Sequence, residues 1–257
     1  MSKKKELQIE IPRYEEGQLE VVLIGKTPLI TNPFSLKAKR ELALPRKKTA
    51  ADRATPKHDF IQEFRESLYF LDGAIADSAP TLFGFPASGF KTALVEAALS
   101  VPGATKKEIS GRVWVQGERV PIFGVPRVFI RMVRNSGIDR KPDVRVRAIF
   151  PRWATVVRVS YVAPLVNEQQ IMNLFAVAGF VVGIGDWRPQ QRGSYGQFEP
   201  TNPDDPDFLA IVQEGGAVAQ KLAYDDPQPY DRESEELWEW YLGEVKRRGI
   251  VVEEVTA

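Results

Sequence analysis

Six apolar segments, in one order along the chain, constrain the fold more than any other feature of this sequence. Four segments have the β-branched or alternating residues of strands, and two have apolar residues at helical spacing after a helix-start signal. In chain order they predict strand, helix, strand, strand, helix and strand at residues 19–30, 85–100, 109–123, 154–162, 167–178 and 195–200. Such an order favours a mixed protein over an all-helical or all-strand one.

This order predicts an α+β protein with a ferredoxin-like, or RRM-like, βαββαβ core in residues 1–200. Both helices then cover one sheet face, and the opposite face is left for a partner. The polar, basic stretches at about 31–84 and 124–150 are expected to be long insertions outside the core. Residues 201–257 are expected to be an acidic, helical C-terminal extension, which either joins the domain or stands as a separate module.

Capping residues and apolar stripes predict how the helices begin and pack. Ser88 is expected to cap the first helix, and Asn167 with Gln170 has the spacing of a capping box for the second. Apolar residues at 237, 238, 241, 242 and 245 have helical spacing within the extension. We expect this stripe to pack back on the domain or against a neighbouring subunit.

The chain contains no cysteine and one histidine. Thiol nucleophiles, disulfides and cysteine-containing zinc sites are therefore excluded, and any histidine chemistry depends on His58, which is expected to be a solvated loop residue. Residues 1–11 lack the apolar segment of a secretory signal, and the longest apolar run is too short to span a bilayer. We expect a cytoplasmic protein with no metal, no cofactor and no membrane partner.

The net charge of +1 hides a strong segregation along the chain. Residues 37–57 hold eight basic and two acidic residues, and residues 106–158 hold thirteen basic and four acidic ones. Residues 199–257 hold fifteen acidic and five basic residues. A basic body favours a polyanion such as nucleic acid, with an acidic extension that screens it or docks on a basic neighbour, whereas the alternative is an ordinary solvated surface.

A glycine-rich loop, AGFVVGIGDWRPQQRGSYGQF at residues 178–198, joins the second helix to the last strand. Glycines let backbone N–H groups approach a ligand, while arginine and aromatic residues on the same loop suit phosphates and bases. A plain glycine-rich turn is the alternative interpretation. A mononucleotide site is disfavoured because no strand precedes these glycines and no helix follows them.

Three separated motifs carry a resemblance to a known family. They are Thr27, Pro28 and Leu29 at the end of the first strand, Pro86, Ser88, Phe90, Lys91 and Leu94 at the first helix, and Gly193, Tyr195 and Gly196 in the glycine-rich loop. In these positions residues 19–200 resemble the RAMP superfamily, the ferredoxin-like subunits that form the guide-RNA-binding backbone of class 1 CRISPR effector complexes.

The resemblance implies an RNA-binding, oligomerising subunit of a CRISPR-associated ribonucleoprotein in antiviral defence. Its implied partners are single-stranded guide RNA, copies of itself and other effector-complex subunits. The chain departs from the family pattern at Thr92, where glycine is usual, and at residues 186–189, which replace a plainer basic stretch. No histidine lies in the first strand or first helix, so the resemblance implies a binding subunit rather than a guide-processing enzyme.

The candidate nucleic-acid-binding residues come from the two basic insertions, the first helix start and the glycine-rich loop. Basic side chains pair with phosphates, a helix start favours an anion, and aromatic rings stack on bases. The candidates are Lys37, Lys39, Arg40, Arg46, Lys47, Lys48, Arg53, Ser88, Lys91, Arg134, Arg140, Lys141, Trp187, Arg188, Arg192, Gly193 and Tyr195.

Three other functions remain open from the sequence. One is a phage or mobile-element protein that binds or anneals single-stranded DNA. Another is a metal-dependent ribonuclease subunit with Asp52, Asp59, Asp139 or Asp143 as its loop aspartate, although none of them stands in a metal-ligand pattern. The third is a structural protein whose copies join through basic body and acidic extension. No catalytic residue is assigned.

Overall fold

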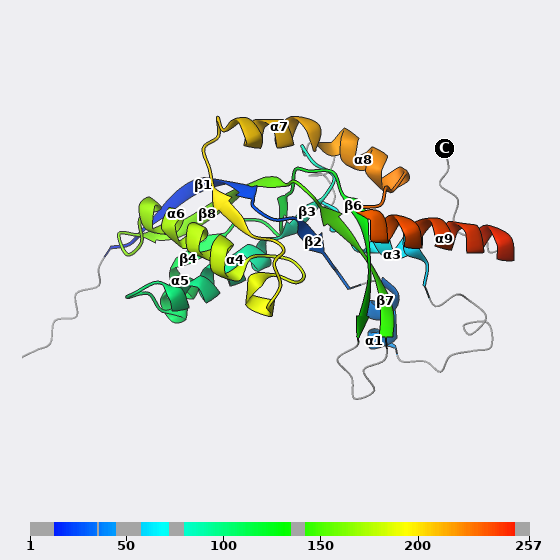
Figure 1. The fold of residues 1–257 in the computed structure, drawn as a ribbon. Helices are drawn as coiled ribbons and strands as arrows, with labels where there is room; N and C mark the ends of the chain where they lie inside the picture. The colour runs from blue at the N-terminus through cyan, green and yellow to red at the C-terminus, as the bar shows by residue number, and fades with distance from the viewer. Residues whose placement is uncertain (1–12, 35, 45–57, 72–79, 135–141, 250–257) are drawn as a thin grey trace, which may run out of the picture.

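A four-stranded antiparallel sheet organises the part of the chain that this computed structural model describes, residues 13–34, 36–44, 58–71, 80–134 and 142–249 (Figure 1). Its strands lie in the order β4 (Val113–Val115), β8 (Ala154–Ala163), β1 (Glu15–Gly25) and β9 (Phe198–Pro200). β1 pairs with β8 from Glu15 opposite Ala163 to Ile24 opposite Ala154. With helices packed on this sheet the protein is α+β, which confirms the expected class.

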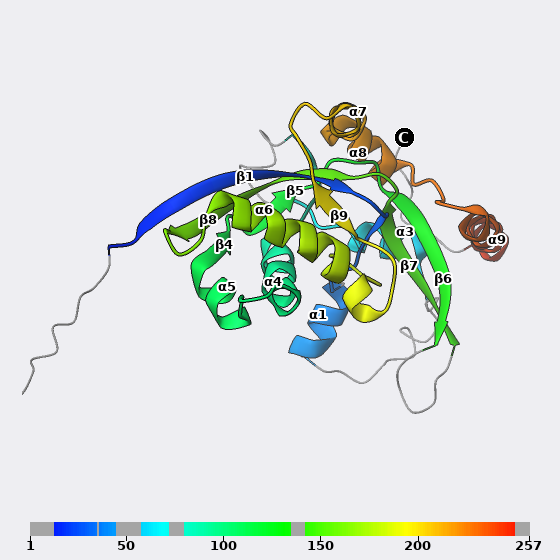
Figure 2. The ribbon, with the colours of Figure 1, turned by 60° about the vertical axis from the view of Figure 1, so that its left-hand side comes forward.

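Helices cover one face of the sheet (Figure 2). α4 (Ala87–Ala97) lies between β1 and β4 in the chain, and α6 (Glu168–Val177) lies between β8 and β9. The short helices η2 (Ala98–Ser100), α5 (Lys106–Arg112) and η3 (Ala178–Val182) extend this layer. The apolar residues predicted for the two main helices are buried, namely Phe90, Leu94, Ala97, Ala98, Ile171, Leu174, Phe175 and Ala178.

The capping prediction is confirmed for α6 and wrong for α4. Asn167 Oδ1 accepts from the N–H of Gln170 at 2.9 Å, and Gln170 Oε1 accepts from the N–H of Asn167 at 3.0 Å. α4 begins at Ala87, one residue before Ser88, and Pro86 occupies the capping position. No side chain caps the first turn of this helix. The fixed φ of proline suits the start of a helix, so Ser88 falls within the first turn.

The opposite face of the sheet is partly covered by the C-terminal extension. Val22 and Ala154 of the sheet pack with Phe208 and Ile211 of α7 (Pro206–Glu214). Figure 2 places α7 on the side of β1 opposite to α6. The expectation that this face is left for a partner is therefore wrong where α7 lies, because the extension supplies its own apolar residues.

The first expected insertion contributes to the core. α1 (Leu36–Ala43) is followed by α3 (Phe60–Glu66), which buries Phe60, Ile61 and Phe64. The prediction that this stretch lies outside the core is thus wrong at its C-terminal end. The basic residues that precede α3 dominate the composition of the stretch and mask this short apolar helix.

The second expected insertion is a β-hairpin and not an excursion from the core. β6 (Arg127–Arg134) and β7 (Pro142–Phe150) pair with each other, and β7 also pairs with β2 (Leu29–Thr31), which gives the sheet order β2, β7, β6. A separate two-stranded ladder joins β3 (Gly84–Pro86) to β5 (Arg119–Pro121). Arg131, Arg145 and Arg147 alternate with Val128, Ile130, Val146 and Ala148, which are buried in the main core. The arginine face also carries a small buried cluster of its own, which includes Phe129 and Ile149.

The apolar stripe of α9 (Arg232–Arg248) packs back on the domain, as predicted. Trp238 and Tyr241 are buried, and the ring of Tyr241 stacks on Phe60 of α3 with centroids 4.2 Å apart. Leu242 is the exception, since it is exposed. α9 therefore shares the main core with α3.

One buried amide ties the C-terminal extension to the strands. Gln220 lies on α8 (Ala217–Asp225) and is fully buried. Its Oε1 accepts from the N–H groups of Leu82 and Phe83 at 2.9 and 3.0 Å. The two N–H groups of its Nε2 are shared among the carbonyls of Ile122, Gly124 and Gly215, which lie 2.7, 2.9 and 3.1 Å away. A single side chain thereby satisfies backbone groups on three separate segments.

Replacing Gln220 by Leu is expected to lower the free energy of unfolding by about 2–4 kcal/mol, because buried N–H and carbonyl groups lose their partner. Urea denaturation followed by tryptophan fluorescence measures this loss. Gln213→Leu, at an exposed position of α7, is the matched control and is expected to stay within about 0.5 kcal/mol of the parent. Equal stability of the two variants would contradict this role of the amide.

Candidate nucleic-acid interface

The glycine-rich loop between η3 and β9 is fastened to the Thr-Pro-Leu turn that follows β1. The N–H of Gly196 donates to the carbonyl of Pro28 at 2.8 Å, and the N–H of Gln197 donates to the Thr27 hydroxyl at 3.0 Å. Gly196 has a φ of +67°, and a Cβ there would lie 1.8 Å from the carbonyl oxygen of Ile184, so the position requires glycine. Two of the three sequence motifs therefore meet in the fold.

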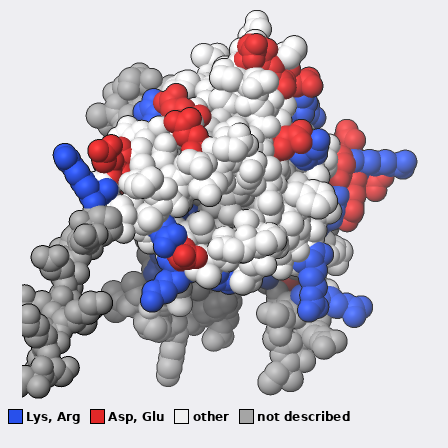
Figure 3. Space-filling view, turned by 90° about the vertical axis from the view of Figure 1, so that its left-hand side faces the viewer, with Lys and Arg blue, Asp and Glu red and all other residues white. Residues whose placement is uncertain are grey.

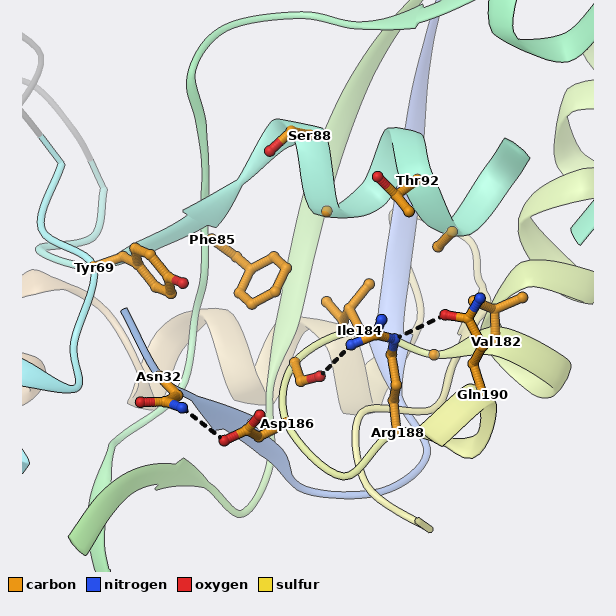
Figure 4. Close-up of a pocket in the computed structure, with 14 residues that line it drawn as sticks. Asn32, Tyr69, Phe85, Ser88, Thr92, Val182, Ile184, Asp186, Arg188 and Gln190 are labelled. Atoms are coloured by element: carbon orange, nitrogen blue, oxygen red, sulfur yellow. Dashed lines mark hydrogen bonds between the residues drawn. The ribbon is translucent and has the colours of Figure 1, made fainter. Parts of the chain in front are cut away.

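A hollow of about 290 Å³ with a mixed polar and apolar lining lies between this loop and the start of α4 (Figure 4). Ser88 and Thr92 of α4 lie on one side, and residues of the glycine-rich loop lie on the other. Asn32 and Tyr69 close one end. The third sequence motif, the helix start, thus faces the glycine-rich loop across what we call the loop–helix hollow.

Four arginines line a second hollow, of about 240 Å³, on the β6–β7 hairpin. Arg131 and Arg145 stand opposite each other in the hairpin register. The lining residues of this arginine hollow are Ile30, Phe129, Arg131, Val133, Arg134, Arg145, Arg147, Asp186 and Trp187. Asp186 also lines the loop–helix hollow, so one loop segment separates the two.

Carboxylates already offset part of the charge of these arginines. Arg131 pairs with Asp231 through Nη2, and its Nε lies 3.5 Å from Glu233 Oε2. Hydrogen bonding to Arg131 lowers the pKa of Asp231 to about 2. Arg147 Nε lies 3.6 Å from Asp186 Oδ2, while burial lowers the pKa of the Arg147 guanidinium. The acidic extension therefore docks on the basic hairpin, as the charge segregation indicates.

Trp187 adds an aromatic surface beside the arginines. The residue is 38% exposed and has a left-handed φ of +52°. Its ring meets Phe129 edge-on with centroids 5.8 Å apart, and Tyr195 meets Phe129 at 5.9 Å. Packing thus holds one side of the Trp187 ring, and the exposed part is available for stacking on a base.

Lys91, a predicted phosphate ligand, does not line the loop–helix hollow. Its Nζ donates to the carbonyls of Ile109 and Ser110 at 3.1 and 2.8 Å and to that of Val113. Burial lowers the pKa of Lys91. The ammonium group therefore binds carbonyls at the C-terminal end of α5, where free helix carbonyls attract a cation. The prediction that Lys91 holds a phosphate at the start of α4 is wrong.

The other predicted residues of the glycine-rich loop have different positions. Arg188 lines the loop–helix hollow, where its Nη1 donates to the carbonyl of Gly185 at 3.1 Å. Arg192 is exposed and left-handed, with a φ of +64°. Gly193 is required by packing, since a Cβ there would lie 1.7 Å from the carbonyl oxygen of Trp187. The loop candidates are thus brought close to one another.

The basic candidates of the expected insertions fall only partly within the described chain. Arg134 ends β6 and lines the arginine hollow. Lys39 is exposed on α1, the helix that also includes Lys37 and Arg40. The rest lie outside the described residues, namely Arg46, Lys47, Lys48, Arg53, Arg140 and Lys141.

Sequence reasoning missed Arg131, Arg145, Arg147 and Asp186 as site residues. The signal is clearest in DVRVR, where Arg145 and Arg147 alternate with valines, and in RVFIRMVR an even spacing places Arg127 and Arg131 on one face. Alternate residues of a strand share one face, so an interpretation of these segments as a hairpin brings the arginines together. The high net charge of the stretch masks this alternation.

His58 is not a solvated loop residue, which corrects that prediction. Its Nδ1 lies 2.8 Å from Glu63 Oε1, and its Nε2 lies 3.2 Å from Asp143 Oδ1. Burial raises the pKa of Glu63. Both ring nitrogens are thus engaged by carboxylates, because α3 packs against β7 and brings these three side chains together.

Two of the four candidate aspartates of a ribonuclease are described, and both have partners within the protein. Asp59 caps α3 by accepting from the N–H groups of Ile61 and Gln62, and Asp143 faces His58. Asp52 and Asp139 lie outside the described residues. Within the described ranges, no group of three or more His, Cys, Asp or Glu side chains is placed to hold a metal ion. The same ranges contain no helix with the length and hydropathy to cross a membrane.

A third hollow, of about 370 Å³, has a different character. It lies by α5 and α6, and its mainly apolar lining includes Val101, Leu165 and Leu174. Its arginine, Arg112, pairs with Glu108 at 3.2 Å. On the face in Figure 3, charged side chains lie mainly toward the margins. This hollow therefore lacks the concentration of cations that the arginine hollow has.

Comparison with protein-family models and with curated proteins finds no match to this chain. Fold and site alone define the class, an α+β protein with an arginine-lined hollow beside an exposed aromatic ring. Guanidinium groups and exposed aromatic rings are the side chains that pair with anions and stack on planar groups.

Replacing Asp231 by Asn tests the ion pair at the edge of the arginine hollow. Asn keeps an acceptor for the N–H of Ser234, but it removes the charge that faces Arg131. A carboxyl whose pKa falls from 3.8 to about 2 on folding stabilises the fold above its unfolded pKa, and this contribution disappears as the pH falls through the folded pKa. We expect a loss of about 1–2 kcal/mol at neutral pH that vanishes near pH 2.

Urea denaturation across this pH range measures the difference. Glu235→Gln, exposed on the same helix turn, is the control for the loss of one negative charge. A difference between Asp231→Asn and the parent that stays constant with pH would contradict the ion pair.

Proposed function

We propose that this chain is a single-stranded nucleic-acid-binding, oligomerising backbone subunit, and that its ligand is guide RNA in a CRISPR-type ribonucleoprotein. The observation that carries the proposal is the arginine hollow with Trp187 at its edge. Guanidinium groups pair with phosphates through two parallel hydrogen bonds, and an exposed indole stacks on any base. Four guanidinium groups line this hollow, and carboxylates at its edge hold those of Arg131 and Arg147.

The sheet topology supports the ferredoxin-like, RAMP-type part of the proposal. β1, α4, β4, β8, α6 and β9 follow one another as strand, helix, strand, strand, helix and strand. In the order β4, β8, β1, β9, the first and third of these strands are central. Two interleaved βαβ units produce this arrangement. The β6–β7 hairpin is an addition to it and carries the arginines.

The position of the two hollows supports a polymeric ligand. A single-stranded nucleic acid that crosses residues 185–188 places its phosphates in the arginine hollow and a sugar or base in the loop–helix hollow. Phosphates and ring faces are common to every sequence, so such contacts give sequence-tolerant binding. Guide binding by a backbone subunit has this property.

The first test is the nucleic acid that copurifies with the protein. We expect an absorbance ratio that reveals bound nucleic acid and, on sequencing, short RNAs with a constant segment. Heterogeneous DNA in their place would support a phage or mobile-element protein. The proposal fails if nothing copurifies and fluorescence anisotropy detects no salt-sensitive binding of labelled single strands.

A double variant tests the arginine hollow itself. Arg134→Gln with Arg145→Gln is expected to weaken binding of all single-stranded nucleic acids alike by about tenfold or more. The steepness with which log affinity falls with log salt concentration is expected to decrease by roughly one to two. Arg112→Gln with Arg158→Gln, on α5 and β8, makes the same change in net charge away from the hollow and is the control. An equal loss in both double variants would assign binding to net charge alone.

A further inference from the structure

A carboxylate lies within a surface that otherwise attracts anions. Asp186 is the acidic side chain among the residues that line the two hollows, and it belongs to both. A carboxylate repels phosphate, so its presence weakens binding of a bare phosphate chain. Asp186 therefore either only fixes neighbouring side chains or accepts a hydrogen bond from the ligand.

Among the described residues, the polar contacts of the Asp186 side chain involve one of its two carboxylate oxygens. Asn32 Nδ2 donates to Oδ2 at 3.0 Å, and Arg147 Nε lies 3.6 Å from the same oxygen. Figure 4 shows the second oxygen, Oδ1, on the side of Phe85, toward the loop–helix hollow. Asp186 thus holds Asn32 and Arg147 through Oδ2, and Oδ1 remains as an acceptor directed at the loop–helix hollow.

The loop–helix hollow suits a sugar more than a phosphate. Its polar lining consists largely of hydroxyl and amide groups, including Ser88, Thr92 and Tyr69. Its arginine, Arg188, donates to its own loop. The pKa of Tyr69 is raised by burial and by the charge of Asp186, which places the phenol within the field of this carboxylate. A volume of about 290 Å³ is roughly ten times the share of one liquid water, the scale of a ribose with its base.

We propose that Asp186 Oδ1 accepts a hydrogen bond from a ribose 2′-hydroxyl, which makes this site prefer RNA to DNA. The inference rests on the proposed nucleic-acid-binding function and names the ligand of that site. Within a polymer the 3′ oxygen is esterified, so the 2′-hydroxyl is the donor that the sugar retains. One free acceptor matches this one donor, whereas a guanine edge presents two N–H groups and requires both carboxylate oxygens.

The test compares ligands that differ in the 2′ group. Fluorescein-labelled oligouridine, oligodeoxyuridine and 2′-O-methyl-oligouridine are titrated into the full-length protein, and Asp186→Ala is compared with the parent. We expect the parent to prefer oligouridine to the other two by roughly tenfold, because the methylated sugar has lost its donor. Asp186→Ala is expected to bind oligodeoxyuridine at least as well as the parent does and to lose most of the preference.

Glu20→Ala is the matched control, since it removes one negative charge from an exposed position on β1. It is expected to keep the preference of the parent. Asp186→Asn retains an acceptor and the size of the side chain, so it is expected to keep a reduced preference for oligouridine. This variant replaces Asp186→Ala in the test if Asp186→Ala does not fold.

Two outcomes overturn the inference in different ways. A parent that does not distinguish the three oligonucleotides, or an Asp186→Ala variant that changes all affinities by the same factor, leaves Asp186 as a positioning residue for Arg147 and leaves nucleic-acid binding intact. A parent that binds none of the three overturns the proposed function as well.

Discussion

The position of both hollows depends on how the glycine-rich loop is hydrogen-bonded along β2. The N–H of Gly196 donates to the carbonyl of Pro28, and the N–H of Asp186 donates to the carbonyl of Ile30 at 3.0 Å. β7 pairs with β2 through the register Leu29 to Phe150. Because β2 carries the loop and also pairs with β7, the arginine hairpin and the loop lie beside each other.

This arrangement gathers cations that repel one another, and the fold offsets part of the repulsion from two directions. Asp231 and Glu233 come from the start of α9, and Asp186 comes from the glycine-rich loop. The guanidinium of Arg131 also lies 4.1 Å from the ring centroid of Phe129, a favourable cation–π distance. Each of these contacts lowers the electrostatic cost of placing the arginines close together.

Much of the central fold is predictable from the sequence because its signals are local. The capping box of Asn167 and the apolar face of Ile171 and Phe175 depend on residues close in the chain. The position of Lys91 is not predictable in this way, since its partners are carbonyls about twenty positions away, of Ile109 on α5 and of Val113 at the start of β4. The engagement of His58 by Asp143 depends likewise on the packing of α3 against β7.

The candidate site is likewise predictable where local motifs define it and not where distant strands form it. The glycine-rich loop and the helix start are recognisable as motifs, and the structure brings both to one hollow. The arginines of β6 and β7 form a site only after the hairpin register places Arg131 opposite Arg145. That register joins these two residues, which lie more than ten positions apart in the chain, and net charge conceals it in the sequence.

Three consecutive loop residues serve different surfaces because of one backbone feature. Asp186 lines both hollows, Trp187 lines the arginine hollow, and Arg188 lines the loop–helix hollow. The left-handed φ of Trp187, between Gly185 at +80° and Arg188, reverses the chain within this short segment. A bulky residue with positive φ is energetically costly, and such cost persists where surrounding contacts fix it. Here the edge-on packing on Phe129 and the close approach of Gly193 to the Trp187 carbonyl fix it, so this turn directs Trp187 and Arg188 to different hollows.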